Sequence, residues 1–467
     1  MKTNHDQLYR DFAKRVRNRL RKYKYESVLH GLAWWLSEKV KSHDDLKYTP
    51  WVVERMALWV LVDDPCFYGN KLLDQNGLVD AINFCRNEHD KLPVKEIGGS
   101  LHLFLRQLFL SQLPYQVTSD FYAFTRQFEI LDGLQKSSYL IREIESYFSI
   151  DYERLKEMLC VSWVLLCTPE AGVGAFQQKM VPLFGIDLVS KFSKKIFFEA
   201  KDVKALSPAR DKVTTDEWWQ PTCLYKFPIV KRGDVLYLFG IVNVRRYLEY
   251  FLFDFAYSKA SARAKSLLDK GFNQYIGNIF NVSFSKVLDE TGLKSEYGVC
   301  GKVCDFAIIE NGFVLLVEVK NKHLTDEMPA LAEVNALNSK LKGTVLKGVE
   351  QLENVEKTII NSDKDLDVVG VILTSGDMVL GSDYLAENER FVISATDMER
   401  MCEIIRAGRD TLKGMFDKIR VKHANPETKQ FVFGQYLNIA EYSGVEDDYT
   451  LARVNKIMDK LASKFSS

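Results

Sequence analysis

The spacing of apolar residues divides the chain into a helical first part and a mixed second part. Up to about residue 200, apolar side chains recur three or four positions apart, as in LHGLAWWLSEKV, WVVERMALWVLV, LHLFLRQLFL and LKEMLCVSWVLL. This spacing predicts helices. We therefore expect a mainly α-helical N-terminal region over residues 1–255, with a connector at 198–222 and one hairpin near 223–242.

The pattern changes near residue 294, where short strand-like runs begin to alternate with helical segments. The runs typical of strands are LKSEYGV, KVCDFAIIE, FVLLVEVK, DVVGVILTS and RFVISA, and AEVNALNSK and LKGVEQLENVEKTIINS between them are helical. This mixture predicts an α/β domain over residues 256–424, with a mixed sheet flanked by helices. Its boundary lies in a long helical stretch at 244–283, and residues 425–467 predict a C-terminal helical extension.

Composition narrows the classes of protein to consider. The chain has 467 residues, too many for one ordinary core, and equal numbers of acidic and basic side chains. Any affinity for nucleic acid must therefore come from a local basic surface. No signal-like segment opens the chain, and apolar runs such as Met56–Val62 are too short to cross a bilayer. We expect a cytoplasmic protein without membrane contacts.

One hairpin carries charges that its apolar pattern does not explain. The segment VCDFAIIENGFVLLVEVKNK, residues 303–322, contains Asn-Gly at 311–312, the strongest short signal for a two-residue turn. Such a turn pairs Glu310 with Phe313 and places Asp305 directly opposite Glu318. Because side chains alternate along a strand, Lys320 shares their face.

Two opposed carboxylates repel each other unless a cation lies between them. Mg²⁺ is typically held by one or two carboxylates together with waters and substrate phosphate, and Mn²⁺ accepts similar oxygen ligands. A lysine two residues further on is placed to activate an attacking water or to neutralise charge on phosphorus. The residues therefore predict a site for phosphodiester hydrolysis, whereas a simple salt bridge at the sheet end explains the lysine but not the paired acids.

The pattern D-x12-E-V-K on a hairpin resembles the catalytic core of the PD-(D/E)xK nuclease superfamily, which has the restriction-endonuclease-like fold. The resemblance covers residues 259–400. It implies a metal site formed by Asp305, Glu318 and the backbone carbonyl of Val319, with Lys320 as the catalytic lysine.

Accessory positions match the family less well. Gln351, on the helix after the hairpin, resembles a glutamine that some branches place near the active site, but Val355 stands where those branches carry tyrosine. Many relatives have a glutamate in the preceding helix, where this chain has Asn273 and Gln274 in KGFNQYIGNIF. Asn273 can still bind a metal through its amide oxygen, and Glu296, expected in the first strand, is an alternative acid.

The N-terminal segment YRDFAKRVRNRLRKYKYES predicts a helix with an apolar stripe and a basic remainder. Such a helix can lie along a phosphate backbone, or it can be an ordinary solvated surface. The candidate nucleic-acid contacts are Arg15, Arg17, Arg19, Arg21 and Lys22.

The sequence thus predicts a Mg²⁺- or Mn²⁺-dependent nuclease, with DNA the expected substrate and RNA an alternative. The helical N-terminal region is expected to recognise the substrate or a protein partner. A helical module fused to such a core resembles proteins of bacterial defence, including antiviral defence, and of DNA processing. A catalytically degenerate domain that binds nucleic acid or protein without cleavage is the second hypothesis. The chain has no phosphate-binding P-loop, H-E-x-x-H or G-x-S-x-G motif.

Overall fold

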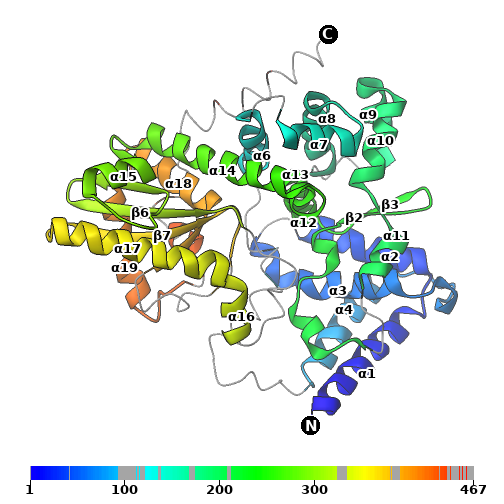
Figure 1. Cartoon of the computed structure of the whole chain (residues 1–467). Coiled ribbons are helices and arrows are strands. Elements are labelled where there is room, and N and C mark those ends of the chain that lie inside the picture. The colour runs from blue at the N-terminus through cyan, green and yellow to red at the C-terminus, as the bar shows by residue number, and fades with distance from the viewer. Residues whose placement is uncertain are drawn as a thin grey trace. The chain divides into compact units, whose positions relative to one another are not determined.

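The structure is a computed structural model, and it falls into two compact units that are described separately (Figure 1). Unit 1 contains the described residues before Phe128 and those of Tyr139–Ala260, and unit 2 contains Phe128–Ser138 and those from Ser261 onward. The division after Ala260 lies close to residue 255, where the sequence suggested a boundary. The structure describes residues 2–40, 43–92, 112, 115, 121–134, 138–167, 174–207, 212–322, 334–378, 380, 390–430, 432–438, 442, 452, 455 and 459.

Unit 1 is mainly helical, as the apolar spacing predicted. The prediction from LHLFLRQLFL lies outside the described residues. The α-helices that begin in unit 1 are α1 (Lys2–Leu20), α2 (Tyr25–Trp34), α3 (Pro50–Val62), α4 (Gln75–His89), α6 (Phe121–Asp132), α7 (Tyr139–Phe148), α8 (Tyr152–Cys167), α9 (Gly174–Phe184), α10 (Ile186–Ile196), α11 (Ala200–Leu206), α12 (Ile241–Glu249) and α13 (Phe251–Ser258).

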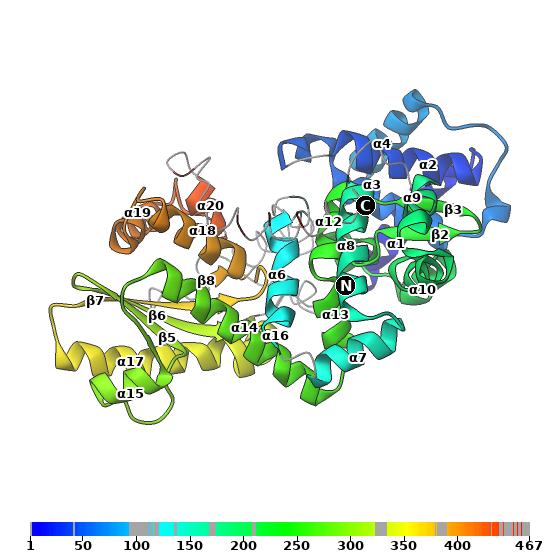
Figure 2. The same cartoon turned by 90° about the horizontal axis from the view of Figure 1, so that it is seen from above.

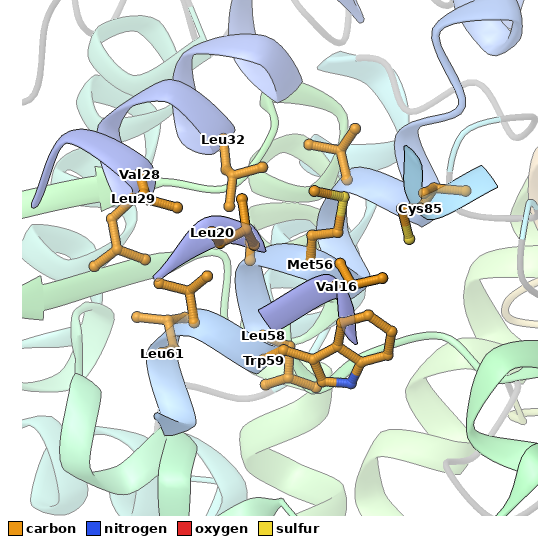
Figure 3. Close-up of a cluster of buried hydrophobic side chains, with 14 of the residues drawn as sticks. Val16, Leu20, Val28, Leu29, Leu32, Met56, Leu58, Trp59, Leu61 and Cys85 are labelled. Carbon is orange, nitrogen blue, oxygen red and sulfur yellow. The ribbon is translucent and has the colours of Figure 1, made fainter. Parts of the chain in front are cut away.

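Helices α1 to α4 pack around one apolar core (Figure 3). Phe12, Val16 and Leu20 of α1 are fully buried in it, and the ring of Phe12 meets that of Trp59 edge-on. These positions recur every four residues and therefore face the same side of the helix. Leu8, which continues the spacing towards the N-terminus, is 38% exposed.

A small sheet completes unit 1. Strands β2 (Ile229–Arg232) and β3 (Val235–Leu238) pair antiparallel, which confirms the hairpin predicted near 223–242. Strand β1 (Phe198–Glu199) pairs parallel to β2 and is followed directly by α11. The prediction of an irregular connector from residue 198 was therefore wrong for its first part, because the strand and helix there are too short to show a period.

The helical stretch predicted at 244–283 is divided into α12, α13 and α14 (Ala262–Ser283). Tyr250 leaves helical geometry between the first two, with φ −102° and ψ 7°. The hydroxyl of Ser261 accepts a hydrogen bond from the backbone N–H of Ala264 and so caps the start of α14. Apolar residues continue through both breaks, which is why the spacing alone did not reveal them.

Unit 2 contains a five-stranded mixed sheet with the order β4-β5-β6-β7-β8. β4 and β6 run antiparallel to β5, while β6, β7 and β8 are mutually parallel. This confirms a mixed α/β domain. The strands are β4 (Val287–Asp289), β5 (Phe306–Glu310), β6 (Phe313–Lys320), β7 (Asp367–Thr374) and β8 (Arg390–Ser394).

The position predicted for the first strand of this sheet was wrong. LKSEYGV belongs mainly to helix α15 (Glu290–Tyr297), and β4 precedes it. Asp289 accepts a hydrogen bond from the backbone N–H of Gly292 and caps this helix, and Gly298 ends it in the left-handed conformation. These two caps define a helix of eight residues, too short for its apolar positions to show the helical period.

Helices cover both faces of the sheet (Figure 2). α15 and α17 (Lys347–Ser362) lie on one face, and α18 (Ala395–Arg406) and α19 (Leu412–Ala424) lie on the other. Gly277 of α14 approaches the ring of Phe306, so α14 also lies against the second face. The remaining helices are α16 (Val334–Leu341), α17 (Lys347–Ser362), α18 (Ala395–Arg406), α19 (Leu412–Ala424) and α20 (Gly434–Asn438), with a π-helical turn (Lys342–Leu346) between α16 and α17.

None of the helices in the described part of the chain is both long and apolar enough to cross a membrane. The helix predicted at the end of the 425–467 extension lies outside the described residues, apart from isolated positions.

Candidate active site

The Asn311-Gly312 turn forms as predicted. Both residues have positive φ, 33° and 79°, which is the requirement of a tight hairpin turn of this kind. Glu310 pairs with Phe313 and Phe306 with Val317, so the predicted register is confirmed over the whole ladder. β5 begins at Phe306, and the next residue outward, Asp305, therefore lies beside the far end of β6.

Asp305 is held by two hydrogen bonds. Its Oδ2 accepts from the backbone N–H of Val319 at 2.8 Å, and its Oδ1 accepts from Nδ2 of Asn273 at 2.7 Å. Asn273 belongs to α14, so this helix orients the carboxylate from outside the sheet. The sequence suggested that Asn273 replaces an acidic metal ligand, whereas the structure shows its amide acting as a donor to Asp305.

Glu318 and Lys320 form an ion pair on the face of the sheet covered by α17. The Glu318 side chain is 2% exposed, and its Oε1 accepts from the Lys320 ammonium, whose side chain is 18% exposed. Oε2 of Glu318 is buried and has no hydrogen-bond partner among the described residues. Oε1 of Gln351, on α17, accepts a hydrogen bond from Nζ of Lys320 at 3.5 Å. Nε2 of Gln351 donates to the carbonyl of Val303 at 3.0 Å. The structure therefore brings Gln351 to the site as predicted.

Burial controls the protonation of both acids. It raises the pKa of Glu318 to about 7, with the nearby Asp305 carboxylate adding to the effect and Lys320 opposing it. Burial also raises the pKa of Asp305, against the hydrogen bonds from Val319 and Asn273 and the charge of Lys320. Burial and mutual repulsion thus oppose the ionisation of both carboxylates, and a bound cation would offset that cost.

Gly348 at the start of α17 allows the helix to approach Glu318. A Cβ atom at this position would lie 3.2 Å from Cγ of Glu318 and 3.4 Å from Cδ1 of Ile372. The glycine thus permits a close contact between helix and strand. The Glu318 side chain thus lies directly beneath α17.

A polar pocket opens beside Lys320 and has a volume of about 480 Å³. Its walls come from α14, the end of β6 and the π-helical turn. Such π-helical turns are frequent at functional sites. The lining residues are Ser266, Asp269, Lys270, Asn273, Gln274, Val319, Lys320, Asn321, Lys322, Gly343 and Thr344.

Sequence reasoning missed one acid of this pocket. Asp269 precedes Asn273 by one helical turn, and its Oδ1 accepts a hydrogen bond of 2.9 Å from Nδ2 of Asn321. The spacing of four residues on a helix places Asp269 and Asn273 on one face, and this signal was available in the sequence. α14 therefore contacts Asn321 directly through Asp269, and it reaches Val319 indirectly through Asn273 and Asp305.

The donor set fits a hard divalent cation. Within the described ranges, no three His, Cys, Asp or Glu side chains come together as a metal cluster, so Asp269 does not join the other two acids. Asp305 and Glu318 remain, and Oε2 of Glu318 has no hydrogen-bond partner in the part of the chain that the structure describes. Two carboxylates suffice for Mg²⁺ or Mn²⁺, which complete their shells with water and substrate oxygens.

Glu296 does not belong to the site. It lies in α15, and its Oε1 pairs with Nζ of Lys286 at 2.6 Å on the surface. The suggestion that Glu296 supplies an additional acid from the first strand was wrong because that segment is helical.

Three of the basic residues suggested for nucleic-acid contact interact within unit 1. Arg15 pairs with Glu88 at 2.9 Å, and the guanidinium of Arg21 forms two bonds of 2.7 Å with Asp63. Arg19 lies over the ring of Phe84, 4.8 Å from its centroid. The other two, Arg17 and Lys22, are half-buried and exposed, respectively. A role of these five residues in nucleic-acid binding stays a prediction.

Searches against models of protein families, curated proteins and solved structures found no significant match to this chain.

Proposed function

We propose that this chain is a metal-dependent nuclease that hydrolyses nucleic-acid phosphodiester bonds, with DNA as the favoured substrate. The observation that carries the proposal is the grouping of Asp305, Glu318 and Lys320, of which Lys320 lines a polar pocket. A buried carboxylate and a half-buried one, both with raised pKa values and next to one ammonium group, are costly for the fold and indicate a functional site. The order of helix, hairpin, helix and parallel strand also supports a restriction-endonuclease-like fold.

Each residue has a proposed role in hydrolysis. Asp305 and Glu318 hold Mg²⁺ or Mn²⁺, with the backbone carbonyl of Val319 as a further ligand. When bound, the cation would polarise the phosphodiester and stabilise the leaving oxygen. Lys320 orients the attacking water and neutralises charge on the phosphate, and Asn273 and Gln351 fix Asp305 and Lys320 through the contacts described above.

A cleavage assay tests the proposal directly. Purified protein is incubated with linear and circular, single- and double-stranded DNA and with matched RNA, in Mg²⁺, Mn²⁺ or EDTA. We expect cleavage with either metal and none in EDTA. If no substrate is cut under any metal condition, the hydrolytic function is rejected.

One observation favours a binding module as the second candidate. Both carboxylate oxygens of Asp305 already accept hydrogen bonds, so this acid is well satisfied without a cation. A domain that uses the pocket only to bind nucleic acid would retain DNA in the assay without cutting it. Under both hypotheses, the binding module and the nuclease, the helical unit 1 recognises the substrate or a protein partner.

We expect metal to stabilise the protein above pH 7 and not at pH 5. Because burial raises the pKa of Glu318 to about 7, the folded state binds this proton more tightly than the unfolded state does. The resulting stabilisation is complete below the ordinary pKa of a glutamate and is lost as the pH rises through 7. The melting temperature of the metal-free protein should therefore fall over this range. Mn²⁺ needs the ionised carboxylates, so it should raise the melting temperature at pH 8 by the equivalent of about 3 kcal/mol at a hundredfold excess over Kd.

The matched variant is Glu318→Gln, which removes the charge and keeps the side-chain size. It should abolish both the stabilisation by Mn²⁺ and this acid's part of the pH dependence, as read by differential scanning calorimetry. An unchanged response to Mn²⁺ in Glu318→Gln would exclude Glu318 as a ligand.

Gly348→Ala should weaken metal binding with little change in overall stability. The new methyl group displaces Glu318, while alanine gains about 0.5–1 kcal/mol over glycine within a helix and offsets part of the packing cost. We expect the Mn²⁺ affinity, measured by titration calorimetry, to fall about tenfold or more. Gly343→Ala adds the same methyl group at the pocket wall, where a Cβ meets nothing within 4 Å, so it tests the contact with Glu318 separately from the added bulk, and equal effects of the two variants would contradict the proposed contact.

A further inference from the structure

The pocket beside Lys320 extends well beyond the three residues that the hydrolytic step requires. Its described lining includes three lysines, one carboxylate, three amides and two hydroxyl groups, but no aromatic side chain. The proposed hydrolytic step gives a role to Val319, Lys320 and Asn273 but not to the other residues of this lining. Their chemistry indicates which part of a nucleic acid the pocket recognises.

We propose that this pocket binds the sugar-phosphate backbone of a single-stranded nucleic acid, and that Lys270 and Lys322 hold the phosphate next to the one that is cut. The inference rests on the proposed function and specifies its substrate class. It adds two binding residues that are outside the catalytic group. It also predicts cleavage without base specificity.

The lining favours phosphate over base recognition. Proteins that bind bases of single strands stack them on aromatic side chains, each worth about 1–3 kcal/mol. The described residues of this pocket offer none. Lysine instead binds phosphate as a point charge and carries no information about the base. Affinity should therefore depend on charge and salt but not on sequence.

The position of Lys270 suits a neighbouring phosphate. It precedes Asn273 by three residues on α14, so the two side chains lie on the same face of the helix. Asn273 contacts Asp305, and Lys320 lies in the same pocket. A nucleic-acid strand that follows this face of α14 can therefore contact Lys270 with one phosphate and Lys320 with another. Lys322, two residues after Lys320, lines the same pocket.

The depth of the reacting groups favours a single strand over a duplex. Glu318 is 2% exposed and the Lys320 side chain 18%, so a phosphate must enter the pocket to reach them. A volume of about 480 Å³ lies in the range of small-ligand sites, about 300–1,000 Å³, and is suited to a unit of nucleotide size. A flexible strand can bend one phosphate into such a recess, whereas a duplex holds its backbone on a stiff, convex surface.

The test compares two double variants of the full chain. Lys270→Ala/Lys322→Ala removes both proposed contacts, and Lys265→Ala/Lys364→Ala removes the same charge from positions that do not line the pocket. Binding of a labelled oligothymidylate of about 12 nucleotides is followed by fluorescence anisotropy in Ca²⁺, with a gel to confirm that the strand stays intact. Oligoadenylate, oligouridylate and a duplex of equal length form the other arms.

We expect wild-type protein and the control variant to bind both DNA homopolymers with the same affinity, and the duplex about tenfold or more weakly. Each phosphate contact contributes about 0.7 to the slope of log affinity against log salt for a single strand. Lys270→Ala/Lys322→Ala should therefore lower this slope by about 1.4 and bind the strand at least about tenfold more weakly. The oligouridylate arm shows whether the strand is DNA or RNA.

The inference is overturned if the wild type does not bind the strand, if it binds duplex as tightly, or if both double variants lose affinity equally. Failure of the nuclease proposal has a different signature. Lysine-dependent strand binding without cleavage in Mg²⁺ or Mn²⁺ would support the binding inference and reject hydrolysis. Cleavage that does not need Lys270 and Lys322 would support hydrolysis and reject the binding inference.

Discussion

Lys320→Ala is expected to reduce metal-dependent cleavage by about a thousandfold. The ammonium group is the only positive charge in contact with Glu318 among the described residues, and Lys320 lines the pocket that we propose to receive the phosphate. Losing a positioned proton donor or acceptor typically costs a factor of about 10²–10⁴, and losing a charge that stabilises the transition state costs about 10²–10³. Initial rates at saturating Mg²⁺ on the best substrate give the measurement.

Two further variants separate catalysis from folding. Lys320→Gln keeps a donor to Glu318 without the charge, so it should fold normally and remain nearly as inactive as Lys320→Ala. Lys347→Ala removes an exposed lysine at the start of α17 that does not line the pocket, and should keep the activity within about threefold. Activity of Lys320→Ala above about one tenth of wild type would contradict the assigned role.

Glu54→Ala is expected to destabilise unit 1 by about 3–5 kcal/mol. Glu54 of α3 is 2% exposed and accepts hydrogen bonds from the backbone N–H of Thr222 at 3.2 Å and from Nδ2 of Asn243 at 2.8 Å. The hydroxyl groups of Thr222 and Tyr115 donate to the same carboxylate. Removing it leaves several buried donors without their acceptor, and each unsatisfied group costs about 1–3 kcal/mol.

Urea unfolding followed by tryptophan fluorescence measures this loss, because all seven tryptophans belong to unit 1. Glu26→Ala is the matched control, since Glu26 is 51% exposed and pairs with Arg232 at 3.3 Å on the surface. Its loss should cost about 1 kcal/mol or less. Equal midpoints for Glu54→Ala and Glu26→Ala would show that the buried network does not hold unit 1 together.

Local signals predicted the centre of the candidate site. Asn311-Gly312 adopts positive φ at both positions because few other residue pairs do so at low cost, and a two-residue turn leaves one register for the strands. That register brings Asp305 beside β6 and places Glu318 and Lys320 on one face. The grouping of these three residues could therefore be predicted without knowing how the rest of the chain packs.

Residues that act from other elements were predicted less well. Asn273 is 32 positions from Asp305 and was suggested as a weak metal ligand, but its contact with Asp305 makes it an orienting donor. Asp269 was missed, and Glu296 was placed in a strand although it lies in α15. The roles of Asn273 and Asp269 depend on which strand α14 lies against, and the four-residue spacing shows only that the two share a helix face. The error at Glu296 has a local cause, because α15 is too short to show the helical period.

The sequence by itself determined the helical character of unit 1, the hairpin and the grouping of two acids with a lysine, because turn geometry and side-chain periodicity act over a few residues. Only the tertiary structure decided that α14 orients Asp305, that Gly348 lets α17 cover Glu318, and that a lysine-bearing pocket opens beside Lys320. These features arise where segments distant in sequence pack together, and packing there depends on the shape and burial of all partners at once.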